Sequence, residues 1–128
     1  MRQDEFLAKV RERGEYADNA EAERVTRAVL GMLGERLTGA EADDLAAQLP
    51  GDLGDALRTA PQEGGTFGPD DFVARLASAV DATRETALWD ASAVLTTVAE
   101  AISGGQLNQL LSQLQSGYAE LFGKPELA

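Results

Sequence analysis

Carboxylates are the only abundant side chains in this sequence that could act as acids, bases or metal ligands. The 128 residues include 22 Asp and Glu, but no Cys and no His. Thiolates and imidazoles build zinc sites, and they also supply the nucleophile or the base of much covalent catalysis, so these chemistries are excluded. Binding of magnesium or calcium by carboxylates, and acid–base catalysis by a buried carboxyl group, stay open.

The acidic residues gather in short clusters that have a simpler interpretation than metal binding. The clusters are Glu41 with Asp43 and Asp44, Asp52 with Asp55, and Asp70 with Asp71. No cluster has the alternating acidic spacing and the glycine of an EF-hand loop. Asp70 and Asp71 fall in the first turn of a predicted helix, where the helix dipole favours negative charge. We therefore interpret the clusters as solvated surface, and we expect no metal and no other cofactor.

The glycine-rich stretch 64–68, Gly-Gly-Thr-Phe-Gly, could in principle hold a phosphate group. A phosphate-binding loop needs a lysine at a set spacing and a strand before it, and both are missing here. We therefore interpret this stretch as a turn between two parts of the chain.

The charge balance excludes several classes of partner. Only 11 basic residues oppose the 22 acidic ones, so the net charge is -11. Nucleic acids and anionic membranes need a cationic surface, which this composition does not provide. No apolar run approaches the length of a membrane span, and residues 1–5 lack the apolar stretch of a signal peptide. The expected location is the cytoplasm.

An internal repeat organises the chain. The segment Asp4–Val10 returns as Asp70–Leu76, and Ala28–Leu30 returns as Ala93–Leu95. Further matches pair Gly39 with Gly104, Leu45 with Leu110, and Gln48 with Gln113. We predict a single domain, 1–128, made of repeat unit 1 (3–58), a linker (59–68) and repeat unit 2 (69–123).

Each unit has the apolar spacing of four helices, and no segment predicts a strand. In the first unit, Gly14 is expected to end the first helix in the left-handed conformation, and a capping box from Thr38 to Glu41 begins the third, which Pro50 ends. In the second unit, Pro69 begins a helix and Ser103 to Gln106 repeats the capping box. The predicted fold is an all-α, eight-helix domain whose two four-helix units pack with pseudo-twofold symmetry.

The repeated motifs carry a family resemblance. Asp4-Glu5-Phe6-Leu7, Ala28-Val29-Leu30 and Leu45-Ala46-Ala47-Gln48-Leu49-Pro50 stand in the first unit, and Tyr118-Ala119-Glu120-Leu121-Phe122 ends the second. With these motifs the chain resembles the bacterial and archaeal family called domain of unknown function 2267, from Asp4 to Phe122. One departure is Gln113-Leu114-Gln115, where the family usually repeats the proline seen at Pro50. The resemblance implies the fold, but it implies no activity, cofactor or site residue.

One candidate interaction surface is a stretch without charge. No residue from Ala101 to Ala119 is charged, although 26% of the chain is. Interface cores are depleted in charge, so the helix over 103–114 could approach another chain. The residues that we select there are Gln106, Gln109, Leu111 and Gln113. The alternative is that these neutral polar residues only solvate the helix.

The second candidate is Trp89, the only tryptophan. On a helix it lies about 180° from Val98, and so points away from the apolar stripe. An exposed tryptophan would mark a contact surface, whereas a boundary tryptophan would cover the seam between the units.

These observations favour a protein-interaction or structural module without catalytic activity, with a protein partner or a second copy of the chain as its target. The alternative is a carboxylate-based enzyme or small-ligand binder that uses a cleft between the repeats. Buried carboxylates lining a sizeable pocket would favour the alternative, and an apolar patch near Trp89 would favour the module.

Overall fold

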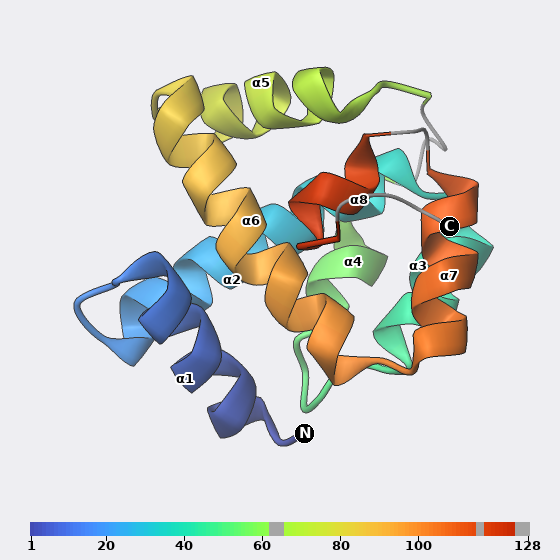
Figure 1. Cartoon of the computed structure of the whole chain (residues 1–128), viewed down its shortest axis with the longest axis horizontal. Helices are drawn as coiled ribbons and strands as arrows, with labels where there is room; N and C mark the ends of the chain where they lie inside the picture. The colour runs from blue at the N-terminus through green and yellow to red at the C-terminus, as the bar shows by residue number, and fades with distance from the viewer. Residues whose placement is uncertain (62–65, 115–116, 125–128) are drawn as a thin grey trace.

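A computed structural model describes residues 1–61, 66–114 and 117–124, and within these residues the protein is all-helical (Figure 1). The prediction of eight helices and no strand is confirmed there. The helices are α1 (Gln3–Gly14), α2 (Asn19–Arg36), α3 (Gly39–Ala46), α4 (Asp55–Thr59), α5 (Pro69–Ala79), α6 (Arg84–Ala101), α7 (Gly104–Gln113) and α8 (Tyr118–Leu121).

The two longest helices, α2 and α6, have 18 residues each and pack against one another in the middle of the molecule. Helix α1 packs on both of them at one end, and α5 packs on both at the other (Figure 1). Helix α4 lies on α2 and α8 lies on α6, while α3 contacts α7 on the remaining side. The two central helices therefore carry most of the inter-helix contacts.

One apolar cluster runs through the whole fold, from Phe6 to Phe122. The central helices contribute the residues at helical spacing that the sequence predicts, among them Val29 and Val94, both fully buried. Phe72 and Tyr118 meet edge to face, with ring centroids 5.9 Å apart. Because the cluster includes residues of every helix, the helices share one hydrophobic core.

The predicted helix starts at Thr38, Pro69 and Ser103 are confirmed, and side chains also cap the two central helices. The Asp18 carboxylate accepts the Glu21 N–H at 2.9 Å, and Thr83 caps α6 through the Thr86 N–H. Thr38 and Glu41 form the complete capping box. At Ser103 only one half of the box is present, because the hydroxyl accepts the Gln106 N–H but the amide side chain does not reach back. A neutral amide is a weaker acceptor than the Glu41 carboxylate.

Two predicted helix ends are wrong in detail. The left-handed residue after α1 is Glu15 (φ 55°), and not Gly14. Gly14 is small for a different reason: a Cβ there would run into the ring of Tyr16, which lies against it. Helix α3 ends at Ala46 and not at Pro50, because the N–H groups of Gln48 and Leu49 bond carbonyls three residues back, in tighter turns.

Candidate functional site

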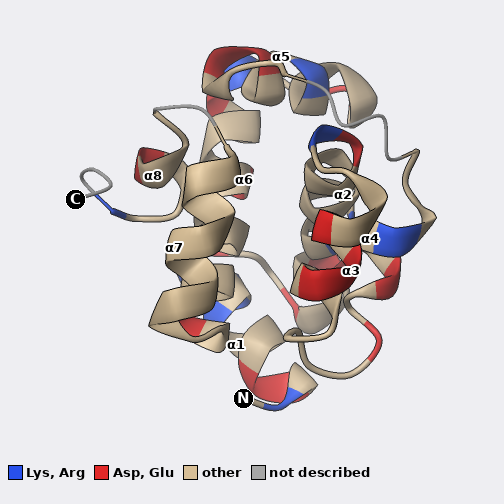
Figure 2. Ribbon diagram, turned by 90° about the vertical axis from the view of Figure 1, so that its right-hand side faces the viewer, with Lys and Arg blue, Asp and Glu red and all other residues tan. Residues whose placement is uncertain are grey.

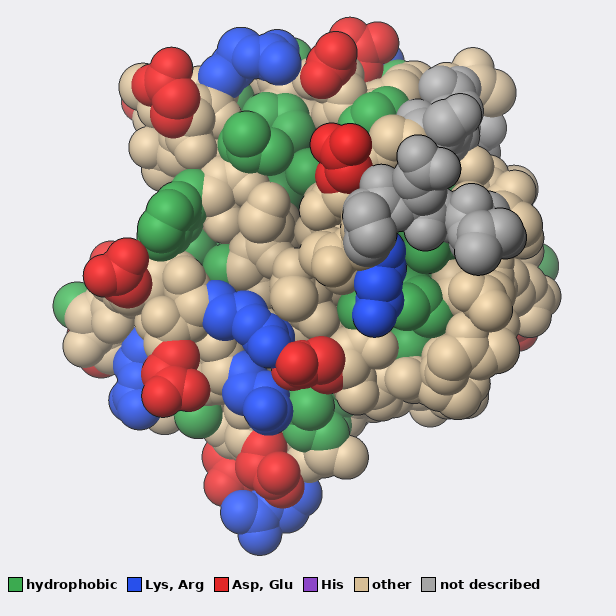
Figure 3. All heavy atoms as spheres, viewed as in Figure 1, with side chains coloured by type: hydrophobic (Ala, Val, Ile, Leu, Met, Phe, Trp, Pro, Cys, Tyr) green, Lys and Arg blue, Asp and Glu red, His purple; other side chains and the backbone are tan. Residues whose placement is uncertain are grey.

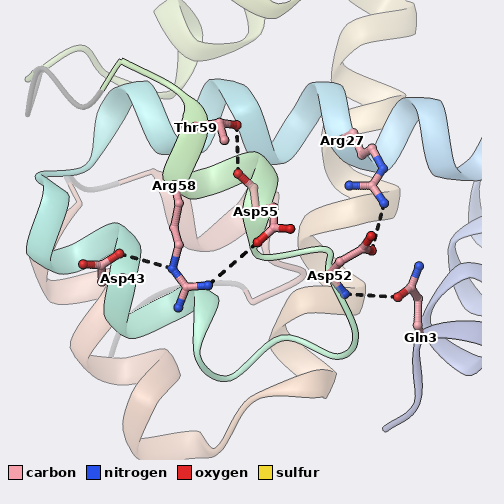
Figure 4. A network of polar contacts seen from close by, with 7 residues as sticks. All are labelled: Gln3, Arg27, Asp43, Asp52, Asp55, Arg58 and Thr59. Carbon is pink, nitrogen blue, oxygen red and sulfur yellow. Dashed lines mark hydrogen bonds and ion pairs between the residues drawn. The ribbon is translucent and has the colours of Figure 1, made fainter.

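The acidic clusters of the first half are bonded to arginines at the surface (Figure 4). Arg58 lies 3.3 Å from Asp43 and 4.0 Å from Asp55. Arg27 donates to Asp52 at 3.0 Å, and this bond holds the pKa of the Asp52 carboxyl below its usual range. Within the described residues, no group of three or more acidic side chains is arranged to hold a metal ion. Asp43, Asp52 and Asp55 are therefore part of ordinary surface ion pairs, and Glu41 caps α3.

Trp89 is at once a seam residue and an exposed one. Its indole Nε1 donates to the Gly14 carbonyl at 3.0 Å, which ties α6 to the end of α1. Its side chain is nevertheless 50% exposed. Trp89 therefore combines the two roles that the sequence left open. One edge of its ring covers the seam between the units, and the rest of the ring is exposed.

A groove of about 480 Å³ surrounds this tryptophan. We call it the α6 groove, and its lining residues are Arg13, Glu85, Leu88, Trp89, Ser92, Ala93 and Thr96. Leu88 is 48% exposed, close to the value for its neighbour Trp89. Figure 3 views the molecule with α1 and α6 in front and shows exposed hydrophobic side chains among charged ones. Leu88, Trp89 and Ala93 therefore give the groove an apolar part.

An ion-pair network closes one side of the α6 groove. The Arg13 guanidinium donates to the Thr97 hydroxyl at 2.8 Å and to the Glu100 carboxylate at 2.6 Å. The bond from Arg13 holds the pKa of the Glu100 carboxyl below its usual range. Glu85, at the opposite end, makes no ion pair within the described part of the chain. The rim is therefore polar, with one neutralised end and one acidic end.

The uncharged helix α7 lies apart from this groove. Figure 2 shows α7 without a charged residue, whereas α3 carries acidic ones. Gln109 and Gln113 are exposed and Gln106 is partly buried, but Leu111 is only 5% exposed and belongs to the core. None of the four lines the α6 groove. The structure therefore separates the candidates into two surfaces.

Leu88 and Arg13 were not selected from the sequence. Leu88 carried a signal, since it is a large apolar residue outside the stripe of α6 and next to Trp89. Arg13 had no signal in the sequence, because its contact with Thr97 joins residues 84 positions apart.

A second, smaller pocket of about 260 Å³ lies between α2, α5 and α6. Its lining residues are Arg24, Val25, Ala28, Val29, Leu76, Val80 and Asp90. The Asp90 carboxylate accepts the Tyr16 hydroxyl at 2.5 Å. Burial raises the pKa of both groups, and Asp90 further raises that of Tyr16. Asp90 is the single carboxylate in this lining.

Comparison with protein families agrees with the architecture. The family described as "Uncharacterized conserved protein (DUF2267)" matches residues 3–121, nearly the whole chain. The chain belongs to this family. The resemblance predicted from the sequence motifs is thereby confirmed, and membership in DUF2267 carries no assigned activity. Among curated proteins, none matches the chain. In the described residues of this DUF2267 protein, no helix is both long and apolar enough to cross a membrane.

Proposed function

We propose that this protein is a non-catalytic interaction module that binds a protein partner through the α6 groove. The observation that carries the proposal is the pair Leu88 and Trp89, neighbouring large apolar residues that are each about half exposed. Tryptophan is enriched among the residues that dominate binding energy at interfaces, typically near the centre and inside a polar rim. Here Arg13, Glu100 and Glu85 supply that polar surround.

The fold supports this role because it orders the central side chain in advance. The indole of Trp89 is anchored to Gly14, and Ala93 beneath it is 5% exposed. A side chain that is already fixed loses little conformational entropy when a partner binds. The α6 groove therefore offers a rigid apolar surface of the kind that interfaces use.

The α7 face is a second candidate surface. Exposed Gln109 and Gln113 lie on a helix without charge, which a partner could approach without repulsion. It lacks an exposed large apolar residue within α7, so it has less support than the α6 groove.

The carboxylate-based enzyme has weaker support. Acid–base catalysis by carboxylates commonly uses two such groups with divergent pKa values. Asp90 is the one acid lining the pocket between α2, α5 and α6, so a second carboxylate is missing from this lining.

We also propose that the domain arose by duplication of a four-helix unit, as the sequence predicts. Several backbone features recur at the predicted spacing. Glu15 and Asp81, 66 positions apart, both have φ 55°. Leu37 and Ile102, 65 apart, both end a long helix in extended conformation. The contacts of α1 with α6 and of α5 with α2 are those that a pseudo-twofold axis would relate.

Site-specific photo-cross-linking in the cells that naturally make this protein tests the interaction proposal. A photoreactive side chain replaces Leu88 in the groove, or exposed Asp44 on α3 as the control. We expect a discrete adduct from position 88 alone. Its mass separates the partners, because an adduct of twice the chain mass is a second copy and light scattering of the purified protein would then show a dimer.

A further inference from the structure

The pocket between α2, α5 and α6, here called the inter-helix pocket, is large enough for a small ring. Its volume is about 260 Å³, and five of its seven lining residues are Val, Ala or Leu. A buried apolar cavity of about 150 Å³ is sufficient to bind benzene. Val80 at its edge is 39% exposed, so a ligand can enter from solvent.

One polar group in this pocket has spare hydrogen-bonding capacity. Asp90 is partly buried, and its Oδ1 accepts the Tyr16 hydroxyl. Within the described residues Asp90 makes no ion pair, and its Oδ2 accepts no hydrogen bond. A carboxylate has about four acceptor sites, so this group can accept a further donor. A ligand that supplies that donor would relieve the cost of its burial.

The space between α1 and α6 shows how the chain itself places a phenol ring beside Asp90. Between α1 and α6, the ring of Tyr16 lies against Gly14 and its hydroxyl bonds Asp90. Under the proposed duplication, the corresponding space lies between α5 and α2, and Ala82, 66 positions after Tyr16, stands at its place. Val80 stands at the place of Gly14 and fills part of the space. The inter-helix pocket therefore has no aromatic ring at the position that Tyr16 takes in the first unit, and it shares with Tyr16 the carboxylate of Asp90.

We infer that the inter-helix pocket binds a small phenol, with the ring against Val25, Leu76 and Val80 and the hydroxyl donating to Asp90. Tyr16 is the precedent for this donor and acceptor pair within the molecule. An aromatic carboxylate would be repelled by Asp90. A neutral donor on an apolar ring suits both the apolar lining and the free acceptor oxygen of Asp90. This site is separate from the α6 groove and extends the proposed function to a small ligand.

Phenol itself is the probe, with toluene as a ring that has no donor. Each is titrated into the isotope-labelled protein, and amide chemical shifts are followed by NMR. We expect saturable shifts for phenol, concentrated on α2, α5 and the first half of α6. The variant Val80→Phe fills the exposed edge of the pocket and should weaken both ligands at least about tenfold, since the space for the ring is lost. The matched control Leu88→Phe, an exposed change in the α6 groove, should alter neither.

The role of Asp90 is tested by Asp90→Ala. Loss of one hydrogen bond should weaken phenol about fivefold while leaving toluene unchanged or tighter. The amide spectrum of each variant shows whether it is folded. The inference is overturned if phenol shifts do not saturate, if Leu88→Phe weakens phenol and Val80→Phe does not, or if benzoate binds more tightly than phenol. None of these results bears on cross-linking from position 88, so the two proposals fail independently.

Discussion

The Trp89 indole and the Gly14 carbonyl join α6 to α1 by a hydrogen bond of 3.0 Å. Gly14 also contacts Tyr16, because the absence of a side chain leaves room for the Tyr16 ring. The Tyr16 hydroxyl in turn donates to Asp90. Consecutive residues of α6 are thus both held by the end of α1. The most exposed aromatic residue of the domain is fixed in place by the fold before any partner arrives.

Trp89 and Leu88 should therefore differ in their contributions to stability. Trp89→Phe removes the indole donor, and we expect the free energy of unfolding to fall by about 1 kcal/mol. Leu88→Ala removes an exposed side chain and should change it by less than about 0.5 kcal/mol. Urea denaturation measures both. A cost for Leu88→Ala as large as that for Trp89→Phe would mean that Leu88 is packed, and the α6 groove would lose its free apolar surface.

Gly14 and Gly31 provide a matched pair of glycine substitutions. Gly14→Ala places a Cβ against the Tyr16 ring and should destabilise the protein by about 1–3 kcal/mol. Gly31 lies inside α2 with nothing within 4 Å of an added Cβ, so Gly31→Ala should stabilise by about 0.5–1 kcal/mol. Thermal unfolding compares the two. Equal effects at the two sites would show that Tyr16 does not pack on Gly14.

Thr26 and Thr97 are both fully buried threonines in the central helices, but only one has hydrogen-bond partners. The Thr97 hydroxyl donates to the Ala93 carbonyl and accepts from Arg13, whereas the Thr26 hydroxyl has no partner in the described part of the chain. Thr26→Val should raise the free energy of unfolding by about 1 kcal/mol, and Thr97→Val should lower it by about 1–2 kcal/mol. Denaturant unfolding of the two variants gives the signs, and the opposite order would contradict these contacts.

The ion pair of Glu100 with Arg13 predicts a pH dependence. The pKa of Glu100 is lowered from its ordinary 4.5 by the Arg13 bond. A carboxylate with a lowered pKa stabilises the fold above its unfolded-state pKa, and this contribution is lost as the pH falls through the folded-state value. The wild type should therefore be more stable than Glu100→Gln at pH 7, and the difference should shrink as the pH falls below 4.5.

Urea unfolding from pH 7 to pH 3 measures this difference. The same change at Glu12, which makes no ion pair in the described residues, is the control. A difference between wild type and Glu100→Gln that grows on acidification would reverse the sign that we predict.

The helices could be predicted from the sequence because their signals are local. Helices begin at Thr38, Pro69 and Ser103 as the sequence predicts, and the apolar stripes are buried. Helix α1 ends at Gly14 as predicted, but the left-handed residue is Glu15. The sequence did not show why Gly14 is a glycine, because the Tyr16 ring and the Trp89 indole contact it across the fold. Likewise, the uncharged composition around Leu111 did not reveal that this residue faces the core.

The candidate site was predictable only in part, for a similar reason. The distance of Trp89 from the apolar stripe indicated its direction, but the stripe alone could not show that α1 covers one edge of the ring and leaves the other free. The inter-helix pocket is formed by three helices. Its free volume depends on Ala82, which has no ring to place where Tyr16 has one in the first unit. Such features arise from packing between distant segments, which periodicity within one helix does not encode.

The central claim, that the α6 groove is a binding face, is tested most directly by the ratio of photo-cross-linking yields from positions 88 and 44 in the source cells. We predict a discrete adduct from position 88 at a yield at least about tenfold above that from position 44. We also predict its loss in a chain that carries Ser92→Arg, because a bulky charged side chain in the groove lining excludes the partner. Equal yields from the two positions, or an adduct that survives Ser92→Arg, would contradict the claim.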